Sequence, residues 1–225
     1  MKSIKIQISY IFLCMILSFL IAPQLGAQQD VPPEVIQAAE EGLSHYMAML
    51  SRQDEEYQND IIGFEKNDPL DGIGFEKNDP FDQAYLGESF RLHGIKLDSI
   101  SNYQENAPVN SILPQRNEWY FLVMIGEQAK SILIVAKTGD TFRAVGIGGM
   151  ETATELDKIN KQWSKGEGYT PLLVKSYRLD NYAFTVPQSS VSNLTIMGKD
   201  KDYSKLENSY DVIKELQSKI EGLQD

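Results

Sequence analysis

The sequence predicts an α+β protein with a mainly antiparallel sheet and flanking helices at the N-terminus, in the middle and at the C-terminus. Three apolar strands follow one another between residues 119 and 147, separated by turn residues alone. Three amphipathic stretches of helical length accompany them, around residues 33–50, 152–163 and 202–223. About 200 residues remain after the first segment of the chain, enough to bury one core, so we expect a single domain over residues 28–225.

Residues 1–27 have the pattern of a secretion signal. Two lysines precede an apolar stretch over residues 8–22, and Leu25-Gly26-Ala27 offers a small-residue cleavage site before Gln28. The apolar stretch is shorter than the roughly 20 residues that span a bilayer. Cys14 follows residues too bulky for a lipobox. We therefore predict a cleaved signal and an extracellular protein, periplasmic if the cell has an outer membrane, with a retained anchor as the alternative.

The mature chain would be acidic and free of cysteine. Cleavage removes two of the 21 basic residues and leaves 19 against 32 acidic residues, a net charge of −13. This charge argues against binding to nucleic acid or to an anionic membrane surface, because both require a basic face. Cys14 is the single cysteine and lies in the signal, so the core must be held without disulfides.

The run Asp30-Val31-Pro32-Pro33 should open the first helix of the mature chain, because proline suits the first helical positions. Its spacing predicts one apolar face made of Ile36, Ala39, Leu43, Tyr46, Met47 and Leu50. His45 falls on the opposite side and should face water.

A tandem repeat follows this helix. Residues 62–72 and 73–83 share the string GFEKNDP at a period of 11. Asn-Asp-Pro in each copy rules out a continuous helix. An EF-hand register would place Pro69 at its third position and Asn78 at its twelfth, where glutamate is needed. A looser carboxylate cluster could still bind calcium weakly. The simplest interpretation is a duplication in a surface loop, which tolerates insertions.

The second copy should carry the structural role. Asp79 is suited to cap a short helix whose first residue is Pro80, and Gly87 would end it. We therefore expect Phe81 and Tyr85 to pack on the sheet and the first copy to be exposed and mobile.

Four strands are predicted between residues 89 and 147. The first, Ser89–Leu97, changes its alternation near Gly94, which suggests a bulge with His93 at the irregularity. Residues 102–116 are a polar loop. Trp119–Ile125, Ser131–Lys137 and Thr141–Ile147 then form an antiparallel meander. The first two strands of this meander are apolar at both parities, so they should be covered on both faces.

The C-terminal half should contain two helices around a hairpin. Capping boxes are expected at Thr152/Glu155 and Ser204/Glu207, with helix starts near Thr152 and at Asp202. The helix that starts near Thr152 has an apolar stripe of Leu156, Ile159 and Trp163 and should end at Gly166. A hairpin over residues 169–186 and a short strand near 194–197 lie between the helices. The last helix repeats Leu206, Ile213 and Ile220, and also Leu216 and Leu223, at seven residues. We expect it to pack on its own domain, with a dimer seam as the alternative.

Candidate chemistry is sparse, and we assign no catalytic, cofactor-binding or metal-binding residue. His45 and His93 are the two histidines, and neither HExxH nor GxSxG occurs. His93 is the better candidate for a serine–histidine arrangement, but a structural role is favoured.

Gly146–Gly149 is interpreted as a tight turn and not as an anion-binding loop. Trp119-Tyr120-Phe121 is interpreted as core and not as a sugar platform. The many acids could supply a carboxylate pair for glycoside hydrolysis, but no pair stands out.

The strings AYLGESFRLHGI, NEWYFLVMIGEQAKSILIVAKTGDTFRAVGIGG and ELDKINKQW carry a resemblance. Over about Tyr85 to Trp163 the chain resembles a group of secreted bacterial α+β proteins of undetermined activity, some of which accompany or are fused to secreted peptidases. The resemblance implies the compartment and the fold class and carries no catalytic residue.

These patterns favour a secreted, non-enzymatic binding or interaction protein whose partner is a secreted protein or a small ligand. The alternative is a pro-domain-like or inhibitory regulator of a secreted peptidase. A carboxylate-based hydrolase is the third hypothesis, and it requires two acids about 5–10 Å apart in a cleft.

Overall fold

The computed structural model describes residues 31–51, 73–76, 78–95, 100–105, 107–189 and 192–222. The chain divides into two compact units, Met1–Pro32 and Pro33–Asp225, and the account below concerns the second. No helix within the ranges given is both long and apolar enough to cross a membrane.

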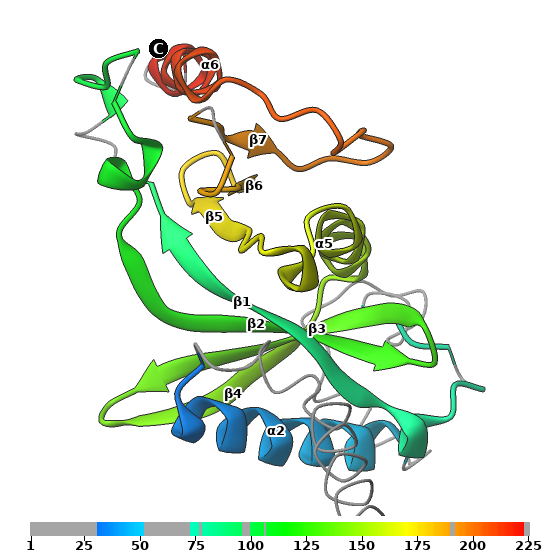
Figure 1. Ribbon diagram of the computed structural model, residues 1–225. Helices are drawn as coiled ribbons and strands as arrows, with labels where there is room; N and C mark the ends of the chain where they lie inside the picture. Colours follow the sequence, from blue (N-terminus) through cyan, green and yellow to red (C-terminus); the bar gives the residue numbers. More distant parts are fainter. Residues whose placement is uncertain are drawn as a thin grey trace, which may run out of the picture. The chain divides into compact units, whose positions relative to one another are not determined.

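One mixed sheet organises this unit (Figure 1). Its strand order is β4-β3-β2-β1-β5-β6-β7. All neighbouring pairs are antiparallel except β1 and β5, which are parallel. The strands are β1 (Tyr85–Gly94), β2 (Gln115–Ile125), β3 (Gln128–Thr138), β4 (Thr141–Gly148), β5 (Leu172–Ser176), β6 (Asn181–Thr185) and β7 (Thr195–Ile196). The predicted α+β class is confirmed, including the meander β2-β3-β4.

Three α-helices and three short 3-10 helices complete the described part of the unit. The α-helices are α2 (Pro33–Ser51), α5 (Met150–Gln162) and α6 (Ser209–Glu221). The 3-10 helices are η1 (Phe81–Gln83), η2 (Val109–Ile112) and η3 (Lys165–Glu167). The three α-helices occupy the predicted N-terminal, middle and C-terminal places.

The helices cover the two faces of the sheet differently. Helix α2 touches β4 and β3 from one face, since Gly42 lies against Ala144 and Leu133. Helix α5 covers the other face, where Ile132, the neighbour of Leu133 in β3, joins its core cluster (Figure 1). Every residue from Trp119 to Met124 in β2 is buried, as the two-sided apolar pattern predicts.

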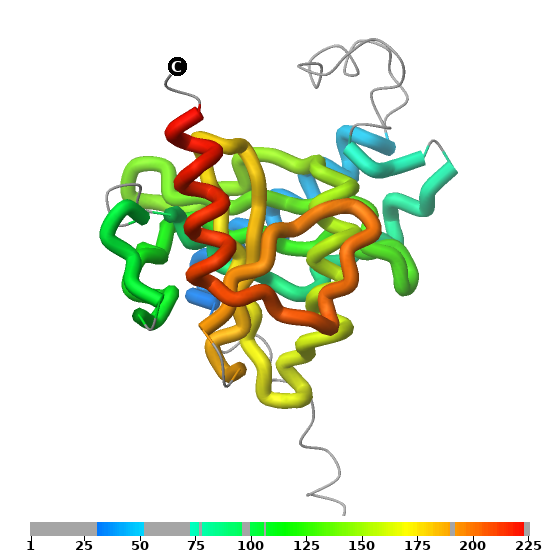
Figure 2. The backbone as a smooth tube through the Cα atoms, turned by 90° about the horizontal axis from the view of Figure 1, so that it is seen from above, coloured from blue at the N-terminus to red at the C-terminus, as the bar shows by residue number. Residues whose placement is uncertain are grey.

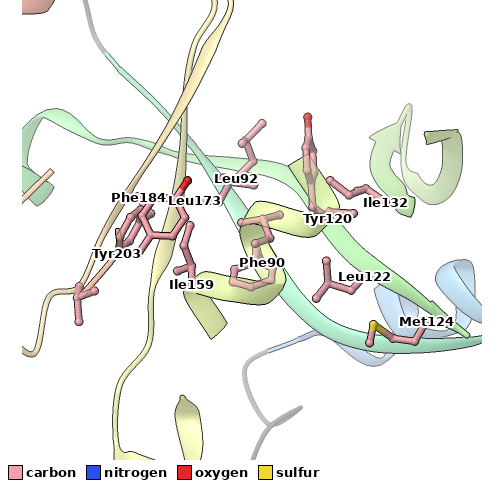
Figure 3. Close-up of a cluster of buried hydrophobic side chains, with 13 residues drawn as sticks. Phe90, Leu92, Tyr120, Leu122, Met124, Ile132, Ile159, Leu173, Phe184 and Tyr203 are labelled. Carbon is pink, nitrogen blue, oxygen red and sulfur yellow. The ribbon is translucent and has the colours of Figure 1, made fainter. Parts of the chain in front are cut away.

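The core beneath α5 is the larger described cluster (Figure 3). Phe90, Leu122 and Leu173 come from β1, β2 and β5, and α5 adds its own apolar stripe, Ala153, Leu156 and Ile159. On the opposite face of β5 and β6, helix α6 packs Val212, Ile213 and Leu216 onto Val174 and Ala183 (Figure 2). The last helix therefore packs within its own unit, as expected.

The buried face of α2 differs from the predicted stripe. Its buried residues are Val35, Ala38, Ala39, Gly42 and Met47. Ala39 and Met47 confirm part of the prediction, whereas its other members, Ile36, Leu43, Tyr46 and Leu50, are half-buried. Small side chains let the helix approach the sheet closely, and this contact decides the rotation of α2 more than hydrophobicity does. His45 is exposed, as predicted.

Both predicted capping boxes are wrong. The N-cap of α5 is Gly149, in the left-handed region at φ 75° and without a side-chain cap bond. Helix α6 begins at Ser209, well after Asp202, and its N-cap Asn208 accepts a hydrogen bond from the Tyr210 amide. Each predicted glutamate serves tertiary structure instead: Glu155 accepts from Tyr203 (2.6 Å), and Glu207 accepts from the Ile196 amide (3.2 Å). Partners distant in the chain outcompete local capping here.

Two helix-end predictions also need correction. Helix α5 ends at Gln162, before Gly166, and Gly166 instead belongs to the separate 3-10 helix η3, whose N-cap is Ser164. Leu206 precedes α6 and so is not part of its stripe, and Leu223 lies outside the described residues.

Strand β1 starts earlier and ends earlier than predicted. It begins at Tyr85 instead of Ser89, and it ends at Gly94. Its register against β2 shifts between Leu86 and Ser89 and again between Arg91 and His93. His93 therefore lies at an irregularity, as expected, but Gly94 is not the bulged residue. Gly94 instead leaves room for the Arg116 side chain of β2.

The second repeat copy docks on the sheet through residues that the pattern did not single out. Phe75 is 2% exposed and meets Phe81 edge to face at 5.7 Å. Asp79 does not cap a helix. It accepts from the Glu76 amide (2.8 Å) and pairs with Lys130 of β3 (3.1 Å). The expectation about the first copy, residues 62–72, lies outside the described residues.

The packing prediction for Tyr85 is wrong, whereas Phe81 is half-buried against Phe75. Tyr85 is 48% exposed, with its hydroxyl donating to the Gly126 carbonyl. Tyr85 already belongs to β1, where alternation directs its side chain away from the core.

Phe75→Ala should destabilise the protein by about 3–5 kcal/mol, because a fully buried aromatic side chain is lost. Phe81→Ala should cost less, since this ring is half-buried. Deleting residues 62–72 should leave stability nearly unchanged, because loop closure changes by only about 0.6 kcal/mol per doubling of length. Melting curves of the three variants test this order, and a deletion more damaging than Phe75→Ala would contradict it.

Gly42→Ala should destabilise the protein, although alanine normally favours a helix by about 1 kcal/mol over glycine. An added Cβ would lie 2.2 Å from Cβ of Ala144, and such overpacking costs about 1–3 kcal/mol. Ala144→Gly should rescue the Gly42→Ala variant in chemical denaturation. A double variant no more stable than Gly42→Ala alone would show that this contact does not fix α2.

Candidate functional site

One pocket lies between α5, the start of β6 with the turn before it, and the segment 197–200, and we name it the α5 pocket. Its volume is about 440 Å³. Met150, Glu155 and Lys158 line it from α5, Asp180 from the β5–β6 turn, Tyr182 from β6 and Met197 from the third segment. Three stretches distant in sequence thus meet around one cavity.

A buried polar link braces one wall of the α5 pocket. The Tyr203 hydroxyl donates to Glu155 Oε2 at 2.6 Å and accepts from the Gly198 amide at 3.0 Å. Lys158 Nζ donates to Glu155 Oε1 at 2.8 Å. Burial and the Glu155 carboxylate raise the pKa of Tyr203 above its usual range, so this phenol stays a donor. The link ties segment 197–203 to α5 and fixes the width of the pocket.

A lysine and a second tyrosine contact Tyr182, a residue of β6. Tyr182 lines the pocket, and its hydroxyl lies 3.1 Å from the Tyr120 hydroxyl. Lys175 Nζ donates to the Tyr182 hydroxyl at 3.2 Å and lies 4.9 Å from its ring centroid. Burial and the Tyr182 hydroxyl raise the pKa of Tyr120. Burial lowers the pKa of Lys175, but Tyr182 and Asp180 together raise it above its ordinary value. Both groups therefore keep their protons at neutral pH.

Glu155, the buried acid of the α5 pocket, is engaged by neighbouring side chains. Both Glu155 oxygens are engaged, one by Lys158 and one by Tyr203. The Asp180 side chain is 89% exposed and lies 3.8 Å from Lys175. Glycoside hydrolysis needs two carboxyl groups that face the substrate, about 5–10 Å apart. The Glu155 carboxylate is held by Lys158 and Tyr203 instead, so the geometry does not favour the hydrolase hypothesis.

A second pocket is made partly by the docked repeat copy. Its volume is about 380 Å³, and Phe75, Glu76, Lys130, Met150 and Lys161 are among its lining residues. The nearby Asp79–Lys130 pair is mostly buried, with side chains 11% and 15% exposed. These contacts anchor residues 73–76 and 78–80 to β3, and we assign this pocket a structural role.

His93 is placed as a structural residue. Its ring is 4% exposed, and Nδ1 lies 3.1 Å from the Arg91 carbonyl oxygen, which fixes the proton on Nδ1 in the neutral form. Burial lowers the pKa of His93 and outweighs the Arg91 carbonyl, which raises it. His93 lines neither pocket described above.

The other sequence candidates also take structural places. Trp119, Tyr120 and Phe121 are all buried, which confirms them as core. Gly148 and Gly149, with φ 154° and 75°, connect β4 directly to α5. Among the described residues no three side chains of His, Cys, Asp or Glu gather in a way that could hold a metal ion. Calcium binding by the repeat is not decided, because its first copy lies outside those residues.

The chain matches no protein-family model, no curated protein and no solved structure. The resemblance of residues 85–163 to secreted bacterial proteins stays a prediction.

His93 should make stability depend on pH. Because its pKa is lowered in the folded state, the unfolded chain takes up a proton more readily. The contribution of neutral His93 to the free energy of unfolding is fully present above the unfolded pKa of about 6.5. It is lost as the pH falls through the lower pKa of the folded state. His93→Gln should therefore flatten the fall in unfolding free energy between pH 7.5 and pH 5. His45→Gln, at an exposed histidine, is the control, and equal slopes for His93→Gln and the parent would contradict the assignment.

Proposed function

We propose that the chain is a secreted binding protein and that the α5 pocket holds its ligand. The observation that carries this proposal is the pocket itself, a cavity of about 440 Å³ between α5, the β5–β6 turn and segment 197–200. Binding sites for small molecules typically occupy about 300–1,000 Å³ and combine apolar lining with a few placed polar groups. A small molecule or one side chain of a partner fits this size.

The lining offers both kinds of contact. Met150, Tyr182 and Met197 supply apolar and aromatic surface, and Met150 is 42% exposed and thus accessible. Thioether and phenol groups adapt to ligands of different shape. The Tyr182 hydroxyl and the charged rim can orient a polar group of the ligand.

The walls of the pocket are rigid before any ligand binds. Glu155, Tyr203 and Gly198 join α5 to segment 197–203, and Tyr120 and Lys175 hold Tyr182, which lines the pocket. A preformed site loses little conformational entropy on binding. Because Glu155 has no free oxygen, this arrangement supports binding more than catalysis.

Secretion is part of the proposal and rests on the pattern of residues 1–27. Regulation of a secreted peptidase, the alternative function, rests on the resemblance alone. Inhibition or assisted folding of a peptidase encoded beside this chain would support that alternative.

Thr154→Trp should abolish ligand binding at the α5 pocket, because Thr154 lines it and is exposed, so an indole ring there would fill the cavity. The measurement is a screen of small molecules and short peptides by ligand-induced melting shifts, followed by titration of each hit. Binders should lose at least about 10-fold in affinity, the equivalent of 1.4 kcal/mol.

Thr141→Trp is the matched control, since Thr141 is an exposed residue of β4 and does not line the pocket. Hits that bind both variants as tightly as the parent protein would place the ligand site elsewhere and overturn the proposal.

A further inference from the structure

Polar side chains continue beside the α5 pocket on the same face of the sheet. Along β2, Arg116 and Glu118 share the face of Tyr120, which belongs to the core under α5. Along β5, Lys175 shares the face of Leu173, from the same core. Lys175 contacts Tyr182 (3.2 Å) and Asp180 (3.8 Å), and both of these line the pocket. The polar row and the pocket are therefore contiguous.

Tyr177 stands between two cations at the exposed end of this row. Its side chain is 54% exposed. Arg116 Cζ and Lys175 Nζ each lie 5.5 Å from its ring centroid, a distance at which cations are attracted to an aromatic ring. The ring holds the two positive groups near each other although they come from different strands.

Arg116 is positioned by the backbone beneath it. A Cβ at Gly94 would lie 2.8 Å from Arg116 Nε and 2.9 Å from Nη2, so the guanidinium rests directly on the glycine. The Arg116 carbonyl also accepts from Arg91 Nε at 3.0 Å. Within the part of the chain that the structure describes, Arg116 makes no ion pair. Its planar donors are thus held in place and available.

Two acids lie close to these cations. Glu118 raises the pKa of Tyr177, second to burial, and Asp180 faces Lys175. Together they offset the charges of Arg116 and Lys175. This balance favours a singly charged anion over a doubly charged phosphate, because Glu118 repels additional negative charge.

We propose that Arg116, Lys175 and Tyr177 form an anion subsite that takes a carboxylate of a ligand whose body lies in the α5 pocket. The guanidinium offers paired N–H donors that match a carboxylate, Lys175 adds a second positive charge, and the Tyr177 ring contacts the adjoining part of the ligand. The proposal deepens the proposed function and rests on it. The ligand is a peptide with a free carboxyl group or an acidic sugar, and both present the same chemistry to the subsite.

The test compares each acid with a neutral partner by NMR titration of the full chain. The probes are 3-phenylpropionate with 3-phenylpropanamide, an acetylated tripeptide with a free or an amidated C-terminus, and galacturonate with galactose. At least one acid should shift the resonances of Arg116, Lys175 and Tyr177 and bind about 10-fold more tightly than its neutral partner. Preference in the peptide pair alone identifies a peptide ligand, and preference in the sugar pair alone identifies a sugar acid.

Variants separate the contribution of the subsite from net charge. Arg116→Gln should abolish the preference for the acid, whereas Glu118→Gln should strengthen binding of the acid by removing repulsion. Lys219→Gln removes a positive charge from α6, on the opposite face of the sheet, and should change nothing.

Equal affinity for every acid and its neutral partner, or an acid preference that survives Arg116→Gln, overturns the subsite. Shifts at Tyr182 and Met197 in the same titrations test the α5 pocket separately. Such shifts without acid preference would leave the proposed function standing and reject the subsite alone.

Discussion

The need to cover both faces of β2 and β3 determines most of this structure. Their apolar side chains point to both sides of the sheet, so each face must carry a helix. Helix α2 supplies one cover and α5 the other. With 13 residues, α5 is about 20 Å long at 1.5 Å per residue, and it leaves part of its face uncovered. That uncovered end bears Arg116, Lys175 and Tyr177, so the length of α5 determines where polar side chains can gather.

The candidate site depends on the same cover through long-range polar contacts. Glu155 lies on α5, yet its partner Tyr203 comes from the segment before α6, 48 residues away. Tyr120 and Tyr182 join β2 to β6, two strands that are not neighbours in the sheet. Buried hydrogen bonds of this kind cost stability when one partner is removed. The pocket is therefore rigid for the same reason that the α5 layer is stable.

The sequence predicts the fold far better than the site. Apolar periodicity locates the meander, the hairpin and the three helices, since burial dominates these elements. Local capping rules fail at Glu155 and Glu207, because distant partners bind these carboxylates. The site depends on pairing β1 with β5, which brings Arg116 near Tyr177 across 60 residues of chain, and no local pattern encodes that register. In the sequence, the alternation of Lys175 with Tyr177 is the one indication of this cluster. Without the register between β1 and β5, this alternation indicates only an ordinary exposed strand face.

The tandem repeat shows how one residue outside a duplicated string can distinguish two identical copies. Both copies contain a phenylalanine and an aspartate equivalent to Phe75 and Asp79, the residues that dock the second copy on the sheet. The docked Phe75 meets Phe81 edge to face, and the residue equivalent to Phe81 after the first copy is Leu70. Leucine fills space but lacks the ring edge that an aromatic pair requires, a contact worth about 0.5–1.5 kcal/mol beyond area burial. In addition, the second copy leads directly into β1, so its docking closes no additional loop. The aromatic contact and the short connection to β1 both favour docking of the second copy, whose Asp79 pairs with Lys130 of β3.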